Sequence, residues 1–373
     1  MYLLNLRLII TYLIDKKNND LPFIELIRTI YNRGTEYLGG IPKGEKMRTR
    51  KHKLHIAHIL TLSLVWLILS AGSDVALSAW QPPIGIPRPE FGIEETYRMY
   101  DDPANRNPAL TYTQNAEGGF YTHYVDNTHP AATDSGNPYG TASIPRETIP
   151  LDWAAGSVVE IHGGPYTWPS TAQYLYRDSY GTLDYPVFVR GISESNRPVI
   201  SSQMRANGSY LILENLDFSL GGHLVLHGDY DQDFMSIRYS EFHDSYNHAI
   251  RIDTSRNIVV YKNDIHHNGN WEATWNESGQ GIALWSDGDS GGATDYIWIV
   301  DNHIHHMGED GVHTLSYDAP YTRYPRYVYI GRNEMDHCRE NAIDIKVVNM
   351  LLFLRINSII FVLVFLLMEM LFV

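Results

Sequence analysis

The stretch Ile258-Val-Val-Tyr-Lys-Asn-Asp-Ile265 decides the fold, because the chain repeats its pattern in four other places. The first, third and eighth residues of each segment are apolar, and successive segments start 24, 23, 39 and 31 residues apart. The five segments are Leu211–Phe218, Met235–Phe242, Ile258–Ile265, Ile297–Ile304 and Val328–Met335. Apolar alternation over so few residues predicts short strands with one buried face.

A second apolar alternation follows in every repeat. Its pairs are Leu224/Leu226, Ile250/Ile252, Ile282/Leu284, Val312/Thr314 and Ile343/Ile345. The sixth place of the last three segments is asparagine (Asn263, Asn302 and Asn333), which can bond backbone at a tight bend and stack from coil to coil. Each repeat therefore predicts strand, asparagine bend, strand, turn, third strand and loop. The fold class is all-β, a right-handed parallel β-helix (solenoid) of about seven to eight coils.

The repeats define the expected domain organisation. Residues 151–346 form the predicted β-helix, and its pattern stops in mid-coil, so the solenoid is expected to be truncated at its C-terminus. Residues 80–150 are rich in Pro, Gly, Asn, Asp and Tyr, and we expect them to cap the N-terminal end. Residues 347–373 are an apolar tail, either a membrane span or a frameshift remnant.

A secretory signal is predicted for residues 47–79. A basic stretch after Met47 is followed by an apolar run and then by small residues, as in signal peptides. Residues 1–46 would then be a non-native leader upstream of the true start, and the mature protein would be secreted, periplasmic or at the cell surface. Membrane contact is expected only if the apolar tail spans a bilayer.

Charge and cysteine content exclude some classes of protein. Residues 80–373 carry 18 Lys and Arg against 37 Asp and Glu, which disfavours nucleic acid as a partner. An anionic polysaccharide would need a local basic strip or a bridging Ca²⁺. Cys338 is the single cysteine, so no internal disulfide can form.

Three runs resemble the pectate-lyase-like superfamily. They are Gly156-Ser-Val-Val-Glu-Ile-His-Gly-Gly-Pro-Tyr-Thr167, Tyr210-Leu-Ile-Leu-Glu-Asn-Leu-Asp-Phe218, and Asn263-Asp-Ile-His-His267 with the later Gly281-Ile282. The closest likeness is to right-handed β-helix repeat proteins, and it covers roughly half of the chain. It implies that the third strand and its flanking loops line a polysaccharide groove, in lyases or in hydrolases.

The outward side chains of the third strands are the candidate site. They are Arg251, Asp253, Ala283, Trp285, His313, Leu315, Asp344 and Lys346, and stacked coils place them in one strip. For β-elimination of a uronate, Arg251, His313 or Lys346 could act as the base.

Carboxylates of the same strip allow two further roles. Asp253, Asp310 and Asp344 are candidate ligands of Ca²⁺, and for hydrolysis the same three are the candidate acid and base. The chain lacks the paired-aspartate signature expected of β-helix polygalacturonases and the lysine-then-arginine arrangement expected of alginate-type lyases. Outward charges on a sheet also form simple solvated ladders.

Aromatic and histidine side chains add two further hypotheses. Sugar stacking is predicted for Trp271, Trp275, Trp285, Tyr317 and Tyr321, although loop aromatics can equally fold insertions onto the solenoid. Two histidine columns are predicted, one of His243, His266 and His305 and one of His267, His306 and His337. We favour a packing ladder for them over a metal site.

The sequence therefore predicts an exported β-helix protein that acts on polysaccharide by lyase-like cleavage of an acidic glycan. The alternatives are a non-catalytic carbohydrate-binding or surface protein of the same fold and an inactive truncated fragment.

Overall fold

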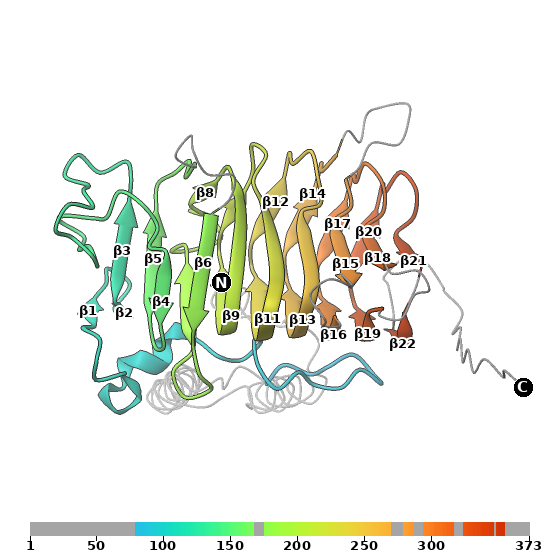
Figure 1. The fold of residues 1–373 in the computed structure, drawn as a ribbon, viewed down its shortest axis with the longest axis horizontal. Coiled ribbons are helices and arrows are strands. Elements are labelled where there is room, and N and C mark those ends of the chain that lie inside the picture. The colour runs from blue at the N-terminus through green and yellow to red at the C-terminus, as the bar shows by residue number, and fades with distance from the viewer. Residues whose placement is uncertain are drawn as a thin grey trace, which may run out of the picture. The chain divides into compact units, whose positions relative to one another are not determined.

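Successive coils of the chain stack in parallel, so that strands distant in sequence lie side by side (Figure 1). The computed structural model describes residues 79–167, 175–269, 279–286, 294–316, 324–346 and 348–354. All of them belong to the second of two units, Ala79–Val373, and residues 1–78, with the predicted leader and nearly all of the signal peptide, lie outside the described part. The predicted parallel β-helix is confirmed.

Each coil contributes to three faces. The first face consists of β3 (His123–Asp126), β5 (Val158–His162), β7 (Val187–Arg190), the second halves of β9 (Gln203–Glu214), β11 (His223–Arg238) and β13 (Ile250–Tyr261), then β16 (Asp295–Val300), β19 (Arg326–Gly331) and β22 (Asn349–Leu354). The second face consists of β8 (Val199–Ile200), β10 (Asp217–Phe218), β12 (Glu241–His243), β14 (Asp264–His266), β17 (His303–His305) and β20 (Glu334–Asp336).

The third face carries the predicted site. It consists of β4 (Asp152–Ala154), β6 (Leu175–Tyr180), the first halves of β9, β11 and β13, then β15 (Ile282–Ser286), β18 (Val312–Ser316) and β21 (Ile343–Ile345). Outside these faces lie an antiparallel pair, β1 (Thr113–Gln114) and β2 (Phe120–Tyr121), and two 3₁₀ helices, η2 (Tyr97–Asp101) and η3 (Pro103–Asn105).

The five repeats pair in the register that the sequence predicts. Leu211, Met235, Ile258, Ile297 and Val328 are successive partners, and all are at most 1% exposed. On the second face Phe218 and Phe242 stack with ring centroids 4.6 Å apart. These inward rows form one continuous apolar core.

The asparagine bends form a buried hydrogen-bonded ladder. The backbone N–H and side-chain Nδ2 of Asn263 donate to Oδ1 of Asn302 at 2.9 and 3.0 Å, and Asn302 donates in the same way to Asn333. Each Nδ2 also donates to a backbone carbonyl, that of Ile237 from Asn263 and that of Val260 from Asn302. The ladder locks neighbouring coils at the bend.

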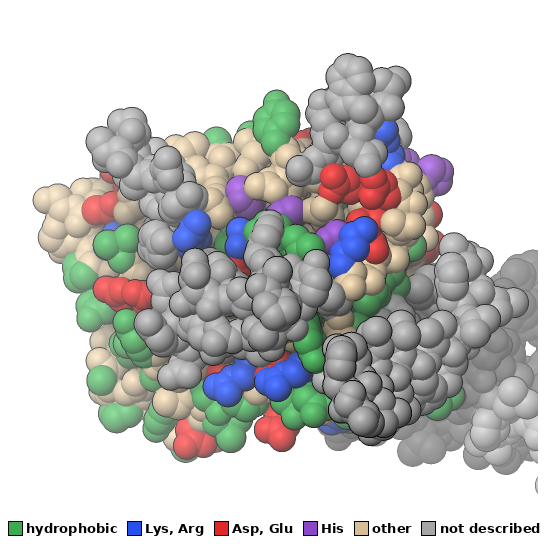
Figure 2. All heavy atoms as spheres, turned by 45° about the vertical axis from the view of Figure 1, so that its right-hand side comes forward, with side chains coloured by type: hydrophobic (Ala, Val, Ile, Leu, Met, Phe, Trp, Pro, Cys, Tyr) green, Lys and Arg blue, Asp and Glu red, His purple; other side chains and the backbone are tan. Residues whose placement is uncertain are grey.

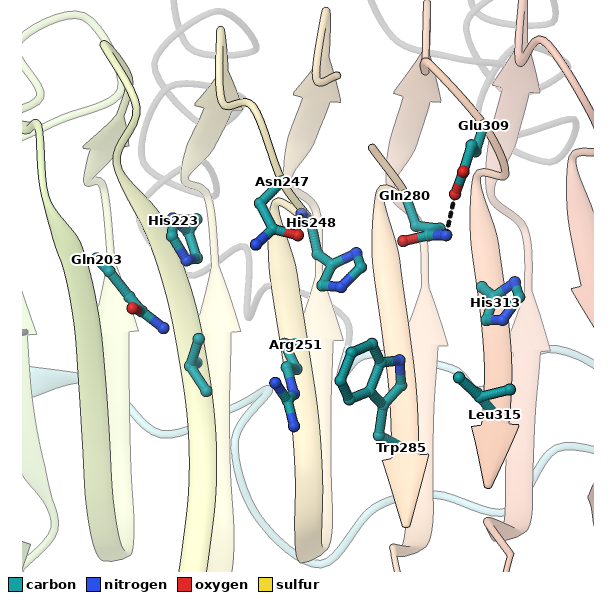
Figure 3. A pocket seen from close by; sticks show the side chains of 11 residues that line it. Gln203, His223, Asn247, His248, Arg251, Gln280, Trp285, Glu309, His313 and Leu315 are labelled. Carbon is teal, nitrogen blue, oxygen red and sulfur yellow. Dashed lines mark hydrogen bonds between the residues drawn. The ribbon is translucent and has the colours of Figure 1, made fainter. Parts of the chain in front are cut away.

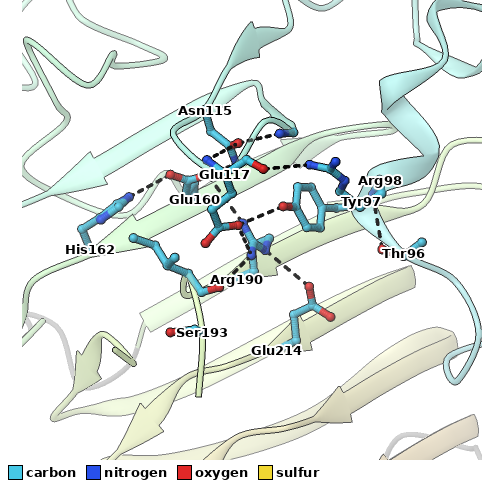
Figure 4. Close-up of polar contacts among 12 residues, drawn as sticks. Thr96, Tyr97, Arg98, Asn115, Glu117, Glu160, His162, Arg190, Ser193 and Glu214 are labelled. Carbon is cyan, nitrogen blue, oxygen red and sulfur yellow. Dashed lines mark hydrogen bonds and ion pairs between the residues drawn. The ribbon is translucent and has the colours of Figure 1, made fainter. Parts of the chain in front are cut away.

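Alternating charges form a second ladder on the outer side of the first face (Figure 4). Glu160, Arg190, Glu214 and Arg238 pair across successive coils, with N···O distances of 3.5, 3.4 and 2.7 Å. All four are buried, and the Arg190 guanidinium lies 3.9 Å from the ring centroid of Tyr97 in η2. The opposite charges neutralise one another where water is excluded.

The start of the described chain runs along the first face, not only over the N-terminal end (blue in Figure 1). Trp80 Nε1 donates to Asp301 at 3.0 Å, and Trp298 Nε1 donates to the Pro87 carbonyl at 2.8 Å. Our expectation that residues 80–150 only cap the solenoid end is therefore wrong for residues 79–95, the lateral segment. The first face has apolar outward residues, such as Val259, which this segment buries.

The solenoid continues beyond Lys346, where the sequence predicted its end. Strand β22 extends the first face, because Leu351 pairs with Val328 of β19 in the common register. An apolar segment can form one more strand of the solenoid. Its apolar composition alone did not distinguish such a strand from a tail. The remainder of the tail, residues 355–373, lies outside the described part. Among the described residues, no helix has the length and apolar character needed to cross a bilayer.

We predict that Asn302→Ala destabilises the fold. The change leaves the buried donors of Asn263 without their acceptor and the Val260 carbonyl without its donor, so the free energy of unfolding should fall by about 2–5 kcal/mol. Urea unfolding measures this loss. Asn196→Ala, on an exposed loop, is the control and should change stability by less than about 0.5 kcal/mol. Equal effects of the two variants would contradict a structural role for the ladder.

Candidate functional site

The outward rows of the third face converge on a groove. Arg251, Ala283, His313 and Asp344 are successive partners in β13, β15, β18 and β21, and Asp253, Trp285 and Leu315 are partners in the next outward row. These two rows of the predicted strip are therefore present, whereas Lys346 follows the end of β21. Because strands are about 4.8 Å apart, the Cα atoms of Arg251 and His313 are separated by about 10 Å, with only the methyl group of Ala283 between them.

A cavity of about 330 Å³ lies above these rows. Gln203, His223, His248, Arg251, Trp285 and His313 line it, and Figure 3 shows their side chains along neighbouring strands. In the view of Figure 2, histidine side chains lie close to lysine and arginine side chains on the surface. The groove thus supplies local cationic and hydrogen-bonding groups on an otherwise acidic protein.

His313 is held by a carboxylate. Its Nδ1 lies 2.9 Å from Oδ2 of Asp310, whose Oδ1 accepts hydrogen bonds from the backbone and side chain of Asn341 at 3.1 and 2.9 Å. Burial raises the pKa of Asp310, but the bonds from His313 and Asn341 outweigh it and lower that pKa overall. The ionised Asp310 therefore favours the tautomer of His313 with a proton on Nδ1, which leaves the lone pair on Nε2.

Arg251 is fixed by two neighbours. Its Nη2 lies 2.6 Å from Oδ2 of Asp253, and its guanidinium carbon lies 3.7 Å from the ring centroid of Trp285. Among the described residues, Nε of Arg251 is buried without a hydrogen-bond partner. A cation–π contact and one ion pair orient the guanidinium, and it keeps donors for a further acidic group.

The three predicted carboxylates do not come together. Asp253 is fully buried against Arg251, whereas Asp310 and Asp344 both lie beside His313, with Oδ2 of Asp344 3.8 Å from Nδ1. Lys346 is exposed, and its Nζ pairs with Asp344 at 2.5 Å. Ca²⁺ needs six to eight oxygen ligands. Within the described part of the groove, Asp310, Asp344 and His313 form the one potential ligand group, with two carboxylates, which is a poor fit to that ion.

Polar residues just before the third strands were missed by sequence reasoning. His248, Gln280 and Glu309 line the cavity, and Gln280 Nε2 donates to Oε2 of Glu309. Burial, followed by the nearby Glu340 and Asp310, raises the pKa of Glu309. A signal was present, because each of these residues lies one or two positions before the small residue that directly precedes a third strand.

Four of the predicted sugar-stacking residues fall in loops outside the described residues: Trp271, Trp275, Tyr317 and Tyr321. Trp285 lies within the groove, where it packs beside Arg251 and His248. Of the five predicted stacking residues, Trp285 is therefore the one whose position the structure describes.

We predict that His248→Gln reduces the acid sensitivity of the fold. Burial, followed by the charge of Arg251, lowers the pKa of His248 from 6.5 to about 4, so the unfolded chain binds an extra proton between these values. Stability is therefore lost as pH falls through this window. As the pH falls from 6.5 to about 4, the free energy of unfolding of the variant should fall by about 2–3 kcal/mol less than that of the parent, as measured by urea unfolding. His129→Gln, on a loop, is the control, and equal pH slopes in all three proteins would contradict the prediction.

Two solved structures show a low similarity to the chain. No family model and no curated protein matches the chain. Two crystal structures resemble it: an alginate lyase from Paenibacillus sp. str. FPU-7 (15% identity, TM-score 0.40, 54% of this chain and 66% of that chain) and pectate lyase Pel9A (14% identity, TM-score 0.43, 58% of this chain and 54% of that chain). Similarity at this level concerns the fold alone. The parallel β-helix itself is established by the pairing of the strands.

Proposed function

We propose that the protein cleaves an acidic polysaccharide by β-elimination in the third-face groove. The observation that carries this proposal is His313, which is oriented by the buried carboxylate of Asp310 and faces the cavity together with Arg251. A histidine with a lone pair on Nε2 can accept a proton at neutral pH. The groove also contains a cation where the carboxylate of a uronate would need one.

Each group has a role in the proposed reaction. Arg251 binds the uronate carboxylate and stabilises the negative charge that develops on it. His313 removes the proton from the carbon next to that carboxylate. The electron pair forms a carbon–carbon double bond, and the bond to the glycosidic oxygen on the next carbon breaks. The departing oxygen can take up the proton that His313 has accepted, so the step balances with the groups of the groove.

The spacing of the row fits one sugar ring. Between Arg251 and His313 the row holds only Ala283, and Trp285 forms the wall beside Arg251. The sugar whose bond breaks would lie above Ala283, with its carboxylate toward Arg251 and its reacting carbon toward His313. A small residue at this position in the row leaves the room that a pyranose requires.

Hydrolysis by the predicted aspartates has less support. Asp253 is fully buried and ion-paired, and both oxygens of Asp310 already accept hydrogen bonds. A glycosidase needs two carboxyl groups on opposite sides of the bond, one of them next to a water molecule. Asp344 alone does not provide that pair. Export from the cell belongs to the proposal, because a polymer of sugars is met outside the cytoplasm.

We predict that His313→Gln abolishes elimination on the uronate polymer that the protein accepts. Alginate, pectate and neutral polysaccharides are incubated with the full chain, and the absorbance of unsaturated ends is followed together with reducing ends. Loss of the base should lower kcat about 100-fold or more, and Asp310→Asn should lower it through the wrong tautomer of His313. The proposal requires both signals to rise together in the parent protein.

Arg251→Gln tests the carboxylate contact. It should raise KM and lower kcat on the same polymer, because the cation acts on bound substrate and on the developing charge. Arg256→Gln, in the same strand but on the first face, is the matched control and should keep the parent rate. If reducing ends rise without unsaturated ends, the reaction is hydrolysis and not elimination. Saturable retention of a glycan without new ends would make the protein a binding module.

A further inference from the structure

Pairs of adjacent polar residues end the strands of the second face in four successive coils. The pairs are His243–Asp244, His266–His267, His305–His306 and Asp336–His337. The second member of each pair has a positive φ of 50–54°, so its side chain turns back beside the first instead of pointing to the opposite face. Nδ1 of His266 lies 2.8 Å from Nδ1 of His267, and the corresponding distance for His305 and His306 is 2.7 Å.

Carboxylates set the tautomer of the first histidine in both central pairs. Nε2 of His305 lies 3.2 Å from Oδ1 of Asp264, and Nε2 of His266 lies 3.2 Å from Oε1 of Glu241. A carboxylate accepts the Nε2 proton, which leaves the Nδ1 lone pair directed at the neighbouring ring. Metal-binding histidines are commonly oriented in this way by a carboxylate on the other nitrogen.

We propose that His305, His306 and Asp336 bind a divalent transition-metal ion of tetragonal geometry, Cu²⁺ or Ni²⁺. The ligand atoms of these three residues all lie within 4.8 Å of one another. The choice of ion rests on the donor set, because two imidazole nitrogens and a carboxylate suit tetragonal Cu²⁺ or Ni²⁺, and the ion would replace the hydrogen bond of 2.7 Å that now joins the two Nδ1 atoms. On binding, the proton shared by the two Nδ1 atoms moves to Nε2 of His306.

The other pairs offer fewer ligands. His243 has an aspartate, Asp244, as the second member of its pair, and among the described residues it falls in no group with a third ligand. His266 and His267 share the paired geometry but, among the described residues, do not fall in any group with a third ligand. Among the described residues, His305–His306 is the pair whose two members belong to one three-residue group, and His305 and Asp336 also belong to groups with His303, whose Nε2 lies 3.3 Å from Oδ2 of Asp336.

A packing ladder is the competing explanation. The ring of His306 stacks on that of His267 with centroids 4.8 Å apart, and His305 stacks on His266 at 5.0 Å. If the histidines only stack, equivalent substitutions in neighbouring coils should have equal effects on Cu²⁺ binding. If His305, His306 and Asp336 form a metal site, only substitutions in that site should weaken binding. His267→Gln is thus a matched control for His306→Gln, because the two histidines occupy the same column and the same backbone conformation.

The test uses the full chain, freed of metal by a chelator and titrated with Cu²⁺ in a non-coordinating buffer. Calorimetry should give one tight site in the parent protein, and electron paramagnetic resonance should show a tetragonal ion with splitting from two nitrogens. His306→Gln and Asp336→Asn should each weaken binding tenfold or more, and His267→Gln should change it less than twofold. Cu²⁺ should also raise the melting temperature of the parent and of His267→Gln, but not that of His306→Gln.

Two results would overturn the proposal. The first is the absence of Cu²⁺ binding by the parent protein. The second is equal binding by the parent, His306→Gln and His267→Gln, which would leave the histidines as a packing ladder. Asp336→Asn keeps both rings in place and so decides the question if His306→Gln fails to fold. None of these outcomes depends on cleavage of a polysaccharide, since the third-face groove is not altered.

Discussion

The register between successive coils is the constraint on which the rest of the structure depends. A shift of one residue would turn every inward side chain of a strand outward, and the reverse. The ladder of Asn263, Asn302 and Asn333 resists such a shift, because Asn263 donates to Asn302 and Asn302 donates to Asn333 at the same bend of successive coils. The apolar rows then stack without gaps, and the polar rows become columns whose members stand about 4.8 Å apart.

The three faces use their outward columns differently. On the first face the column of Glu160, Arg190, Glu214 and Arg238 is buried, because the chain before the solenoid covers it. Its charges are neutralised by one another and contribute to structure. On the third face no described segment covers the equivalent columns over the cavity, and Arg251 and His313 stay available to a ligand. The same repeat therefore produces a structural ladder on one side and a groove on another.

Sequence periodicity predicted those parts of the molecule that repeat. The alternation around Ile250, Ile282, Val312 and Ile343 was enough to place Arg251, Ala283, His313 and Asp344 in one outward row, and the structure has that row. Alternation orients side chains only within strands, so Glu309 and His248, which lie just before strands, were missed, although both contribute to the cavity. The position of residues 79–95 was missed for the same reason. Burial of Asp253 depends on the conformation of Arg251, which alternation does not determine.

The most direct test of the central claim is a crystal structure of the His313→Gln protein with an oligosaccharide of the uronate polymer that the parent cleaves. We expect a sugar ring above Ala283, with its carboxylate on the guanidinium of Arg251 and its reacting carbon facing residue 313. An oligosaccharide bound on another face, or one whose carboxylate points away from Arg251, would contradict the account.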